Sequence, residues 1–159
     1  MGVFVADVRP RWSDMDSFGH VNHASTVTLL EEARVELIFT EAARHDIDGF
    51  RRGVVVARLA VDYHRPLVVD GGSIRVEMAV RELRSASFSI DYKVRSGRAP
   101  TDAVAATAST RLVPYNRSSE RPRRLTDAER DFLAGWLARS DGDDSRAGGA
   151  GSRCERPGW

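Results

Sequence analysis

One long amphipathic pattern, accompanied almost entirely by strand patterns, limits the folds open to this chain. Residues 25–46, STVTLLEEARVELIFTEAARHD, carry mostly apolar side chains at helical spacing. This stripe consists of Val27, Leu30, Arg34, Leu37, Ile38 and Glu41. Asn22 or Ser25 is suited to cap the start of the helix, which we expect to end near Asp46. The pattern predicts one long helix near the N-terminus.

Strand patterns come before and after this helix in the sequence. The predicted strands fall within residues 3–12, 53–69, 71–83, 86–97 and 102–116, and Pro66 interrupts the second of them. The third is the clearest, since polar residues alternate with Ile74, Val76, Met78 and Val80. A short helix capped by Thr126 or Asp127 follows. This order predicts an α+β domain with an antiparallel sheet, whose edges and open face a homodimer would cover.

Length, charge and cysteine content set further limits. A chain of 159 residues suits a single domain, which we expect to span residues 1–139, and the Gly-, Asp- and Arg-rich residues 140–159 are expected to form a disordered tail. Cys154 is the single cysteine, so no intrachain disulfide can form. A net charge of +1 and the lack of a long apolar run give no reason to expect nucleic-acid or membrane partners. We therefore expect a cytoplasmic protein.

A dense group of polar residues, DMDSFGHVNHA at 14–24, comes directly before the helix. A carboxylate of Asp14 or Asp16 near a helix N-terminus is a stabilised anion that could attack an electrophile or deprotonate water. The same two residues could instead serve only as loop and capping groups. Gly19 allows a backbone conformation that other residues resist, and amides near His23 could polarise a carbonyl oxygen.

The histidines in this group open a second interpretation, a metal site. His20 and His23 could bind a metal ion together with one of the aspartates. No further cluster of metal-binding side chains appears elsewhere in the sequence. His45 and His64 are isolated and are expected to be surface or core groups. The sequence also lacks a nucleophile elbow, a phosphate-binding glycine loop and a dinucleotide fingerprint. We therefore expect neither a metal ion nor a resident cofactor.

The segment DMDSFGHVNHASTVTLLEEAR resembles the Asp-x-Asp-x-x-Gly-His-Val-Asn signature of hotdog-fold acyl-CoA thioesterases, the 4-hydroxybenzoyl-CoA thioesterase-like family. The likeness continues, in the same order, through VVVARLAVDYHRPLVVDGGSIRVEMAVREL, RSASFSIDYKV, ATASTRLVPYN and LTDAERDFL, and so covers roughly residues 4–137. It implies the hotdog fold, a long central helix wrapped by an antiparallel sheet. It also implies active sites shared across a homodimer or homotetramer, and hydrolysis of an acyl-CoA to a carboxylic acid and free coenzyme A.

The resemblance further implies roles for individual residues. Asp16 matches the catalytic aspartate, acting as nucleophile or general base, and Asp14 matches an acid of variable role. His23 matches the position whose backbone amide points to the thioester oxygen, and whose side chain takes part in some relatives. The other matched positions, expected to shape the loop or contact the substrate, are Trp12, Gly19, His20, Asn22, Arg65, Ser85 and Ser87. Candidates for the phosphates of coenzyme A are Arg58, Arg65, Arg84 and the arginines in 121–124.

Two other functions stay open at this point. A hotdog dehydratase would use an aspartate and a histidine on a hydroxyacyl thioester, and a non-catalytic module would bind acyl-CoA without cleaving it. Thr26 stands where relatives often have tyrosine, a change that concerns the acyl pocket more than the reaction. The sequence does not choose between aromatic and aliphatic acyl groups, or between coenzyme A and a carrier protein as the thiol.

Overall fold

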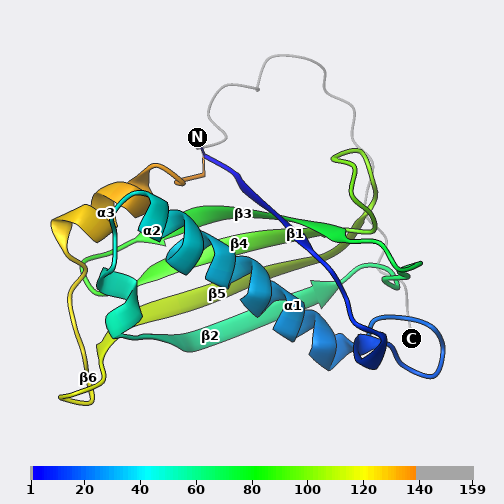
Figure 1. Ribbon diagram of the computed structural model, residues 1–159, viewed down its shortest axis with the longest axis horizontal. Coiled ribbons are helices and arrows are strands. Elements are labelled where there is room, and N and C mark those ends of the chain that lie inside the picture. Colours follow the sequence, from blue (N-terminus) through cyan, green and yellow to red (C-terminus); the bar gives the residue numbers. More distant parts are fainter. Residues whose placement is uncertain (1, 139–159) are drawn as a thin grey trace, which may run out of the picture.

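One long helical stretch crosses one face of an antiparallel sheet (Figure 1). The computed structural model describes residues 2–138. The helical stretch comprises α1 (His23–Val35), a π-helical turn (Glu36–Glu41) and α2 (Ala42–Arg44). Asn22 caps its start, as predicted, because its side chain accepts a hydrogen bond from the Ala24 amide. The predicted end near Asp46 is also confirmed.

The sheet has the strand order β1-β3-β4-β5-β2, and β6 pairs with β5. All of these pairs are antiparallel. The strands are β1 (Phe4–Val8), β2 (Val54–Tyr63), β3 (Ile74–Leu83), β4 (Phe88–Arg95), β5 (Val104–Asn116) and β6 (Arg121–Pro122). The predicted α+β class is confirmed. The strand expected within residues 53–69 ends earlier, at Tyr63, because the next two amides both donate to the Ala105 carbonyl and turn the chain away.

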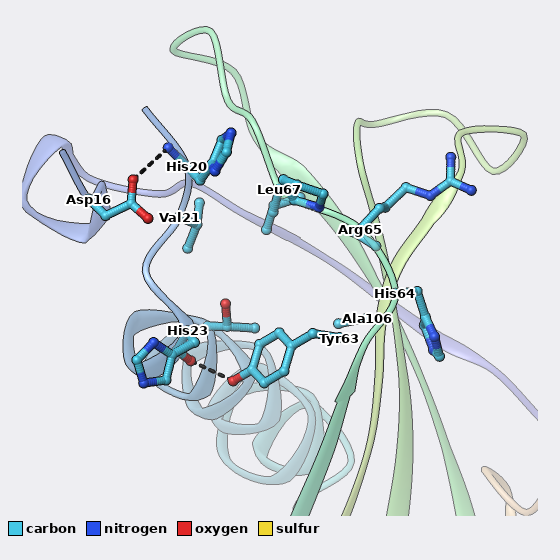
Figure 2. A pocket seen from close by; sticks show the side chains of 12 residues that line it. Asp16, His20, Val21, His23, Tyr63, His64, Arg65, Leu67 and Ala106 are labelled. Atoms are coloured by element: carbon cyan, nitrogen blue, oxygen red, sulfur yellow. Dashed lines mark hydrogen bonds between the residues drawn. The ribbon is translucent and has the colours of Figure 1, made fainter. Parts of the chain in front are cut away.

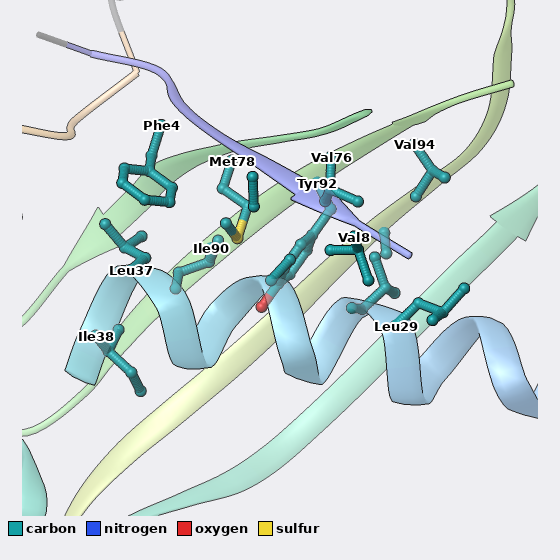
Figure 3. Close-up of a cluster of buried hydrophobic side chains, with 14 of the residues drawn as sticks. Phe4, Val8, Leu29, Leu37, Ile38, Val76, Met78, Ile90, Tyr92 and Val94 are labelled. Carbon is teal, nitrogen blue, oxygen red and sulfur yellow. The ribbon is translucent and has the colours of Figure 1, made fainter. Parts of the chain in front are cut away.

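The core lies between the helix and the sheet (Figure 3). The alternation predicted for β3 is confirmed, since its inward side chains are at most 1% exposed: Ile74, Val76, Met78 and Val80. Each such side chain contributes about 1.5–3 kcal/mol when buried. The helix buries a wider face than its predicted stripe, because Leu29 and Ala33 are buried as well. Val27 and Glu41 are only partly buried.

The C-terminal helix α3 (Asp127–Ala134) is joined to the rest of the fold by a buried ion pair. Thr126 caps α3 in a capping box with Glu129, as its predicted role requires. Glu129 is fully buried and binds Arg123 through both carboxylate oxygens, at 2.7 and 2.8 Å. Arg123 also donates to the Gly49 carbonyl at 2.8 Å, so the pair connects α3 to the segment that precedes β2.

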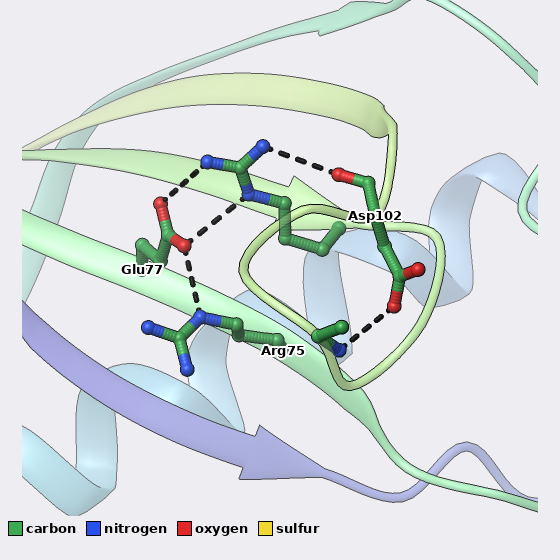
Figure 4. A network of polar contacts seen from close by, with 5 residues as sticks. Arg75, Glu77 and Asp102 are labelled. Atoms are coloured by element: carbon green, nitrogen blue, oxygen red, sulfur yellow. Dashed lines mark hydrogen bonds and ion pairs between the residues drawn. The ribbon is translucent and has the colours of Figure 1, made fainter.

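A second polar network fixes the connection between β4 and β5 (Figure 4). Glu77 accepts hydrogen bonds from Arg75 at 2.9 Å and from Arg95 at 3.1 and 3.2 Å. Arg95 also donates to the Asp102 carbonyl at 3.2 Å, and the Asp102 carboxylate accepts from the Ala99 amide. The loop is therefore held in place immediately before β5 begins.

The edge strand β2 is exposed along nearly its whole length. Val56 and Leu59 pair with Leu112 and Thr110, which are buried, so all four side chains belong to the core-facing side of the sheet. Val56 and Leu59 nevertheless remain 48% and 37% exposed. No helix among residues 2–138 is long and apolar enough to cross a membrane. The tail predicted at 140–159, with Cys154, lies outside the described residues.

Candidate active site

The loop at residues 15–21 is a closed turn directly before α1. Met15 and Val21 form an isolated antiparallel bridge, and the Asp16 amide donates to the His20 carbonyl at 2.7 Å. Gly19 has φ +77°, in the left-handed region that side chains other than glycine resist. Gly19 therefore has the conformational role that its place in the motif predicts, and the loop brings Asp16 next to the helix start.

Asp16 is held as a carboxylate that has one oxygen available. Its Oδ1 accepts hydrogen bonds from the amides of Phe18, at 2.8 Å, and His20, at 3.1 Å. The bond from the His20 amide is the largest cause that holds the pKa of Asp16 below its ordinary value of 3.8. Within residues 2–138, Oδ2 of Asp16 has no hydrogen-bond partner. The group is therefore ionised near neutral pH and can approach a ligand.

Asp14 is in a different environment although it is only two residues away. The residue is buried, at 3% exposure, and its carboxylate accepts three hydrogen bonds from Arg11 at 2.7, 3.2 and 3.1 Å. The side-chain bond from Arg11 lowers the pKa of Asp14. The Asp14 carbonyl also accepts from the Asn22 amide at 2.8 Å. Asp14 therefore supports the loop, whereas Asp16 faces a cavity.

The first turn of α1 presents an oriented amide. As the first helical residue, His23 has no intrahelical acceptor for its N–H group. The carbonyl of the same peptide group, that of Asn22, accepts from the amide and hydroxyl of Thr26 at 3.0 and 3.3 Å. The next peptide group joins His23 to Ala24 and is held at both ends. The Ala24 amide donates to Asn22 Oδ1, and the His23 carbonyl accepts from the Tyr63 hydroxyl at 2.6 Å. Donors fixed in this way can stabilise developing negative charge without first reorganising.

A cavity of about 430 Å³ joins the loop, the helix start and the end of β2 (Figure 2). It is lined by Asp16, His20, Val21, His23, Thr26, Tyr63, His64, Arg65, Pro66, Leu67, Ala105 and Ala106. Five of the residues singled out from the sequence therefore lie around one cavity, namely Asp16, His20, His23, Thr26 and Arg65. The lining contains a carboxylate, a guanidinium, imidazole groups and apolar side chains. This combination suits a substrate that carries a polar reacting group on an apolar acyl chain.

Three residues expected from the sequence to contact the substrate do not line this cavity. Trp12 is 92% exposed and does not line the cavity. Ser85 and Ser87 lie in the turn between β3 and β4, where the Ser85 carbonyl accepts from the amide of Leu125, just before α3. Figure 1 shows α3 at the opposite end of the sheet from the start of α1. Within one copy of the chain, these two serines are therefore remote from Asp16.

Sequence reasoning missed two polar residues of the cavity, Tyr63 and His64. Tyr63 had been assigned no role, and His64 was expected to be isolated. The structure places His64 in the cavity lining, with Nε2 at 2.8 Å from the Thr107 hydroxyl. The only signal for them is their position beside Arg65, where a long strand ends. The pattern does not say that this strand end meets the helix start.

A metal site is not supported in the part of the chain that the structure describes. There, no three side chains of His, Cys, Asp or Glu lie close enough together to hold a metal ion. His20 and His23 line the cavity with Asp16, but they do not form such a group.

Comparison with known proteins gives the family. Residues 10–137 match the model of the thioesterase-like superfamily. A thioesterase from Thermus thermophilus, solved with coenzyme A and Zn, is 28% identical, with a TM-score of 0.65 over 83% of this chain and 92% of that chain. A protein from Pseudomonas aeruginosa is also 28% identical, with a TM-score of 0.67 over 81% of this chain and 96% of that chain.

A 1,4-dihydroxy-2-naphthoyl-CoA thioesterase from Synechocystis shares the fold at 15% identity, with a TM-score of 0.69 over 84% of this chain and 96% of that chain. No curated protein matches the chain. The family match covers the loop, the helix and every strand from β2 to β6. The chain therefore belongs to the thioesterase-like superfamily, as a thioester hydrolase with the hotdog fold.

Proposed function

We propose that this protein hydrolyses an acyl-CoA to a carboxylic acid and free coenzyme A. The observation that carries this proposal is that the available oxygen of Asp16 and the oriented helix start at His23 border the same cavity. A negatively charged group and a fixed amide donor are the two elements that acyl transfer requires. The Thermus thermophilus relative solved with coenzyme A supports the choice of thiol.

The proposed reaction begins with the thioester carbonyl directed at the start of α1. The His23 amide donates to the carbonyl oxygen, and the helix dipole favours the negative charge that develops there. Asp16 then acts in one of two ways. As a nucleophile it forms a mixed anhydride and releases the coenzyme A thiolate, and water cleaves the anhydride. As a general base it removes a proton from the water that attacks the carbonyl.

Arg65 is suited to receive a negatively charged part of the substrate. It borders the cavity, is exposed, and has no carboxylate within 4.0 Å among the described residues. A guanidinium without such a partner is a natural receiver for a phosphate. We propose that Arg65 contributes to binding the coenzyme A portion.

We also propose that two copies of the chain pair through β2. The strand is a long, exposed edge, and the core-facing side chains of Val56 and Leu59 are only partly covered by their own chain. A two-fold axis would pair the two β2 strands in antiparallel orientation and continue the sheet across both copies. In such a dimer, the end of the partner's sheet that carries Ser85 and Ser87 would lie next to the cavity of the first copy.

Lysine at both Val56 and Leu59 is expected to convert the dimer into a monomer. Each substitution places a charge where pairing would bury it, which costs free energy only in the dimer. Light scattering coupled to size exclusion gives the mass. The matched control is Val5→Lys, at a residue 37% exposed on the opposite edge strand β1, which should leave the mass unchanged. A double variant that stays dimeric would contradict pairing through β2.

Thiol release from a panel of aromatic, short and long aliphatic acyl-CoAs tests the proposed reaction. Turnover of one class would identify the acyl group. A folded protein that binds acyl-CoA without releasing thiol would instead be the binding module considered above. Loss of water from a hydroxyacyl-CoA, with no thiol release, would identify a dehydratase.

A further inference from the structure

Arg34 places a positive charge between the long helix and the sheet. The residue belongs to α1 and is only 8% exposed. Among residues 2–138, the one hydrogen bond of its side chain goes to the Tyr92 hydroxyl, a neutral acceptor at 3.4 Å. The one carboxylate of these residues within 4.0 Å is that of Glu31, at 3.9 Å on a side chain that is 64% exposed. An exposed carboxylate at this distance compensates a buried charge weakly.

Arg123 shows how the same fold compensates a buried arginine fully. Its side chain is 14% exposed and binds both oxygens of the buried Glu129 carboxylate, at 2.7 and 2.8 Å. Arg34 is buried to a similar degree, with a side chain 10% exposed, and has no comparable partner among the described residues. A buried cation without a matched anion is costly, and an apolar side chain would pack there without that cost. Arg34 is therefore suited to bind an anion that comes from outside its own chain.

A second buried polar group without a partner belongs to the sheet below Arg34. Thr110 is fully buried, and its hydroxyl has no hydrogen-bond partner in the described part of the chain, although buried hydroxyls are normally paired. Figure 3 shows Tyr92 extending its hydroxyl from the sheet toward the helix. Tyr92 pairs with Ala108 of β5, and Thr110 is the next core-facing residue of that strand, about 7 Å further along. The three polar groups therefore occupy neighbouring positions in an otherwise apolar core.

The core-facing side of β5 connects these groups to the candidate active site. Ala106 lines the cavity, and Ala108 and Thr110 follow it on the same side of the strand, over a length of about 13 Å. The residues that pair with these three on the edge strand β2 are Tyr63, Val61 and Leu59. Leu59 remains 37% exposed, so the helix leaves this side of the sheet partly open. Two alanines and an incompletely covered edge strand thus separate the cavity from Thr110.

We propose that Arg34 selects an acyl group whose far end carries a carboxylate, so that the substrate is the coenzyme A thioester of a dicarboxylic acid. This inference rests on the proposed function. With the thioester at the His23 amide, an extended acyl chain that follows β5 would bring its far end to Arg34. Its carboxylate would accept charge-assisted hydrogen bonds from the guanidinium, which binds carboxylates in a defined geometry. The hydroxyls of Tyr92 and Thr110 supply further donors.

Matched pairs of acyl-CoAs test this selection through thiol release. The two members of a pair have the same number of carbons, and one ends in a carboxylate and the other in a methyl group. Over a series of chain lengths, kcat/KM should favour the carboxylate by about tenfold or more at the length that reaches Arg34. Arg34→Met should invert this ratio, because the carboxylate would then be buried without a partner. A wild-type protein that favours the methyl end at every length would overturn the inference.

Three further variants separate selection from a structural role of Arg34. Arg44→Met makes the same change on an arginine of the same helical stretch whose side chain is 67% exposed, and should keep the wild-type ratio. Arg34→Lys keeps the charge without the paired donors and should keep part of the preference. Thr110→Val removes the unpaired hydroxyl at nearly constant shape and should lower the preference. An unchanged ratio in Arg34→Met would mean that Arg34 does not meet the acyl group, and the inference would fail.

Direct titration distinguishes a failure of this inference from a failure of the proposed function. The same pairs of acyl-CoAs are titrated calorimetrically into Asp16→Asn protein, with and without Arg34→Met. Tighter binding of the carboxylate-ended member, lost when Arg34 is replaced, supports the selection even if the wild-type protein hydrolyses no acyl-CoA. Hydrolysis of methyl-ended acyl-CoAs, with equal Kd values for both members of every pair, would uphold the proposed function and overturn the inference.

Discussion

Asparagine in place of Asp16 is expected to lower the kcat of acyl-CoA hydrolysis on the order of a thousandfold or more. The amide can still accept hydrogen bonds from Phe18 and His20, so the loop should keep its shape. It lacks the negative charge that either attacks the carbonyl or removes a proton from water. Thiol release at saturating substrate measures kcat, and circular dichroism verifies the fold. Retention of more than a tenth of wild-type kcat would exclude Asp16 from the chemistry.

Asp14→Asn is the matched control for this substitution. It makes the same chemical change two residues away, on a carboxylate that is buried against Arg11. We expect a lower free energy of unfolding, because the ion pair is lost, while kcat stays within about tenfold of wild type. A loss of kcat as large as that of Asp16→Asn, in folded protein, would mean that the two aspartates act together.

The pH dependence of the reaction follows from the same hydrogen bonds. The pKa of Asp16 lies below its ordinary value of 3.8, so the carboxylate form dominates at every pH above that value. If Asp16 is the required base or nucleophile, kcat/KM should show no acid limb from this group between pH 7 and about pH 5.

Alanine in place of Glu129 is expected to lower the free energy of unfolding by about 3–5 kcal/mol. Arg123, with a side chain only 14% exposed, would be left without its carboxylate partner, and the capping box of α3 would be lost. Urea unfolding measures the change. Asp131→Ala, on the exposed side of the same helix, is the control and should change stability by less than about 0.5 kcal/mol. A double replacement, Arg123→Met with Glu129→Leu, should recover much of the loss.

The same ion pair predicts that stability falls in acid. Burial alone would raise the pKa of Glu129, but the hydrogen bonds from Arg123 and Thr126 outweigh it and hold the pKa below its ordinary 4.5. A carboxyl group with a lower pKa in the folded state stabilises the fold above its unfolded pKa. That stabilisation is lost as the pH falls below about 4.5 and through the folded value. The slope of stability against pH in this range should be smaller in Glu129→Ala.

Periodicity predicted the elements that have one buried face. The alternation in β3 and the helical spacing of Leu30, Leu37 and Ile38 each mark the face that packs into the core. The same logic gave less information about β2, whose residues are β-branched and apolar but lie exposed on an edge. Its apolar sequence fits the pairing proposed for this edge, and that pairing leaves no periodic pattern in a single chain. The end of β2 at Tyr63 depends on two amides that share the Ala105 carbonyl, a long-range contact that no local pattern encodes.

The candidate site was predictable only where its residues are contiguous in sequence. Asp16, Gly19, His20 and His23 occupy one loop and one helix start, so a single motif brought them together. The motif could not show which of the two aspartates is already bonded within the chain. Arg11, which donates to Asp14, lies before the motif in a stretch predicted to be strand. Tyr63 and His64 come from a distant part of the chain and required the folded sheet to be seen.

The hydrogen bond from Tyr63 to the His23 carbonyl links the exposed edge strand to the first turn of α1. If two copies pair through β2, the strand that carries this tyrosine is held on both of its edges, by β5 and by the partner, and by β5 alone once the pair dissociates. Dissociation would then loosen the peptide group beside the His23 amide and blunt its ability to stabilise the reacting oxygen. Specific activity would consequently decline on dilution, and protein abundance itself would act as a switch on turnover.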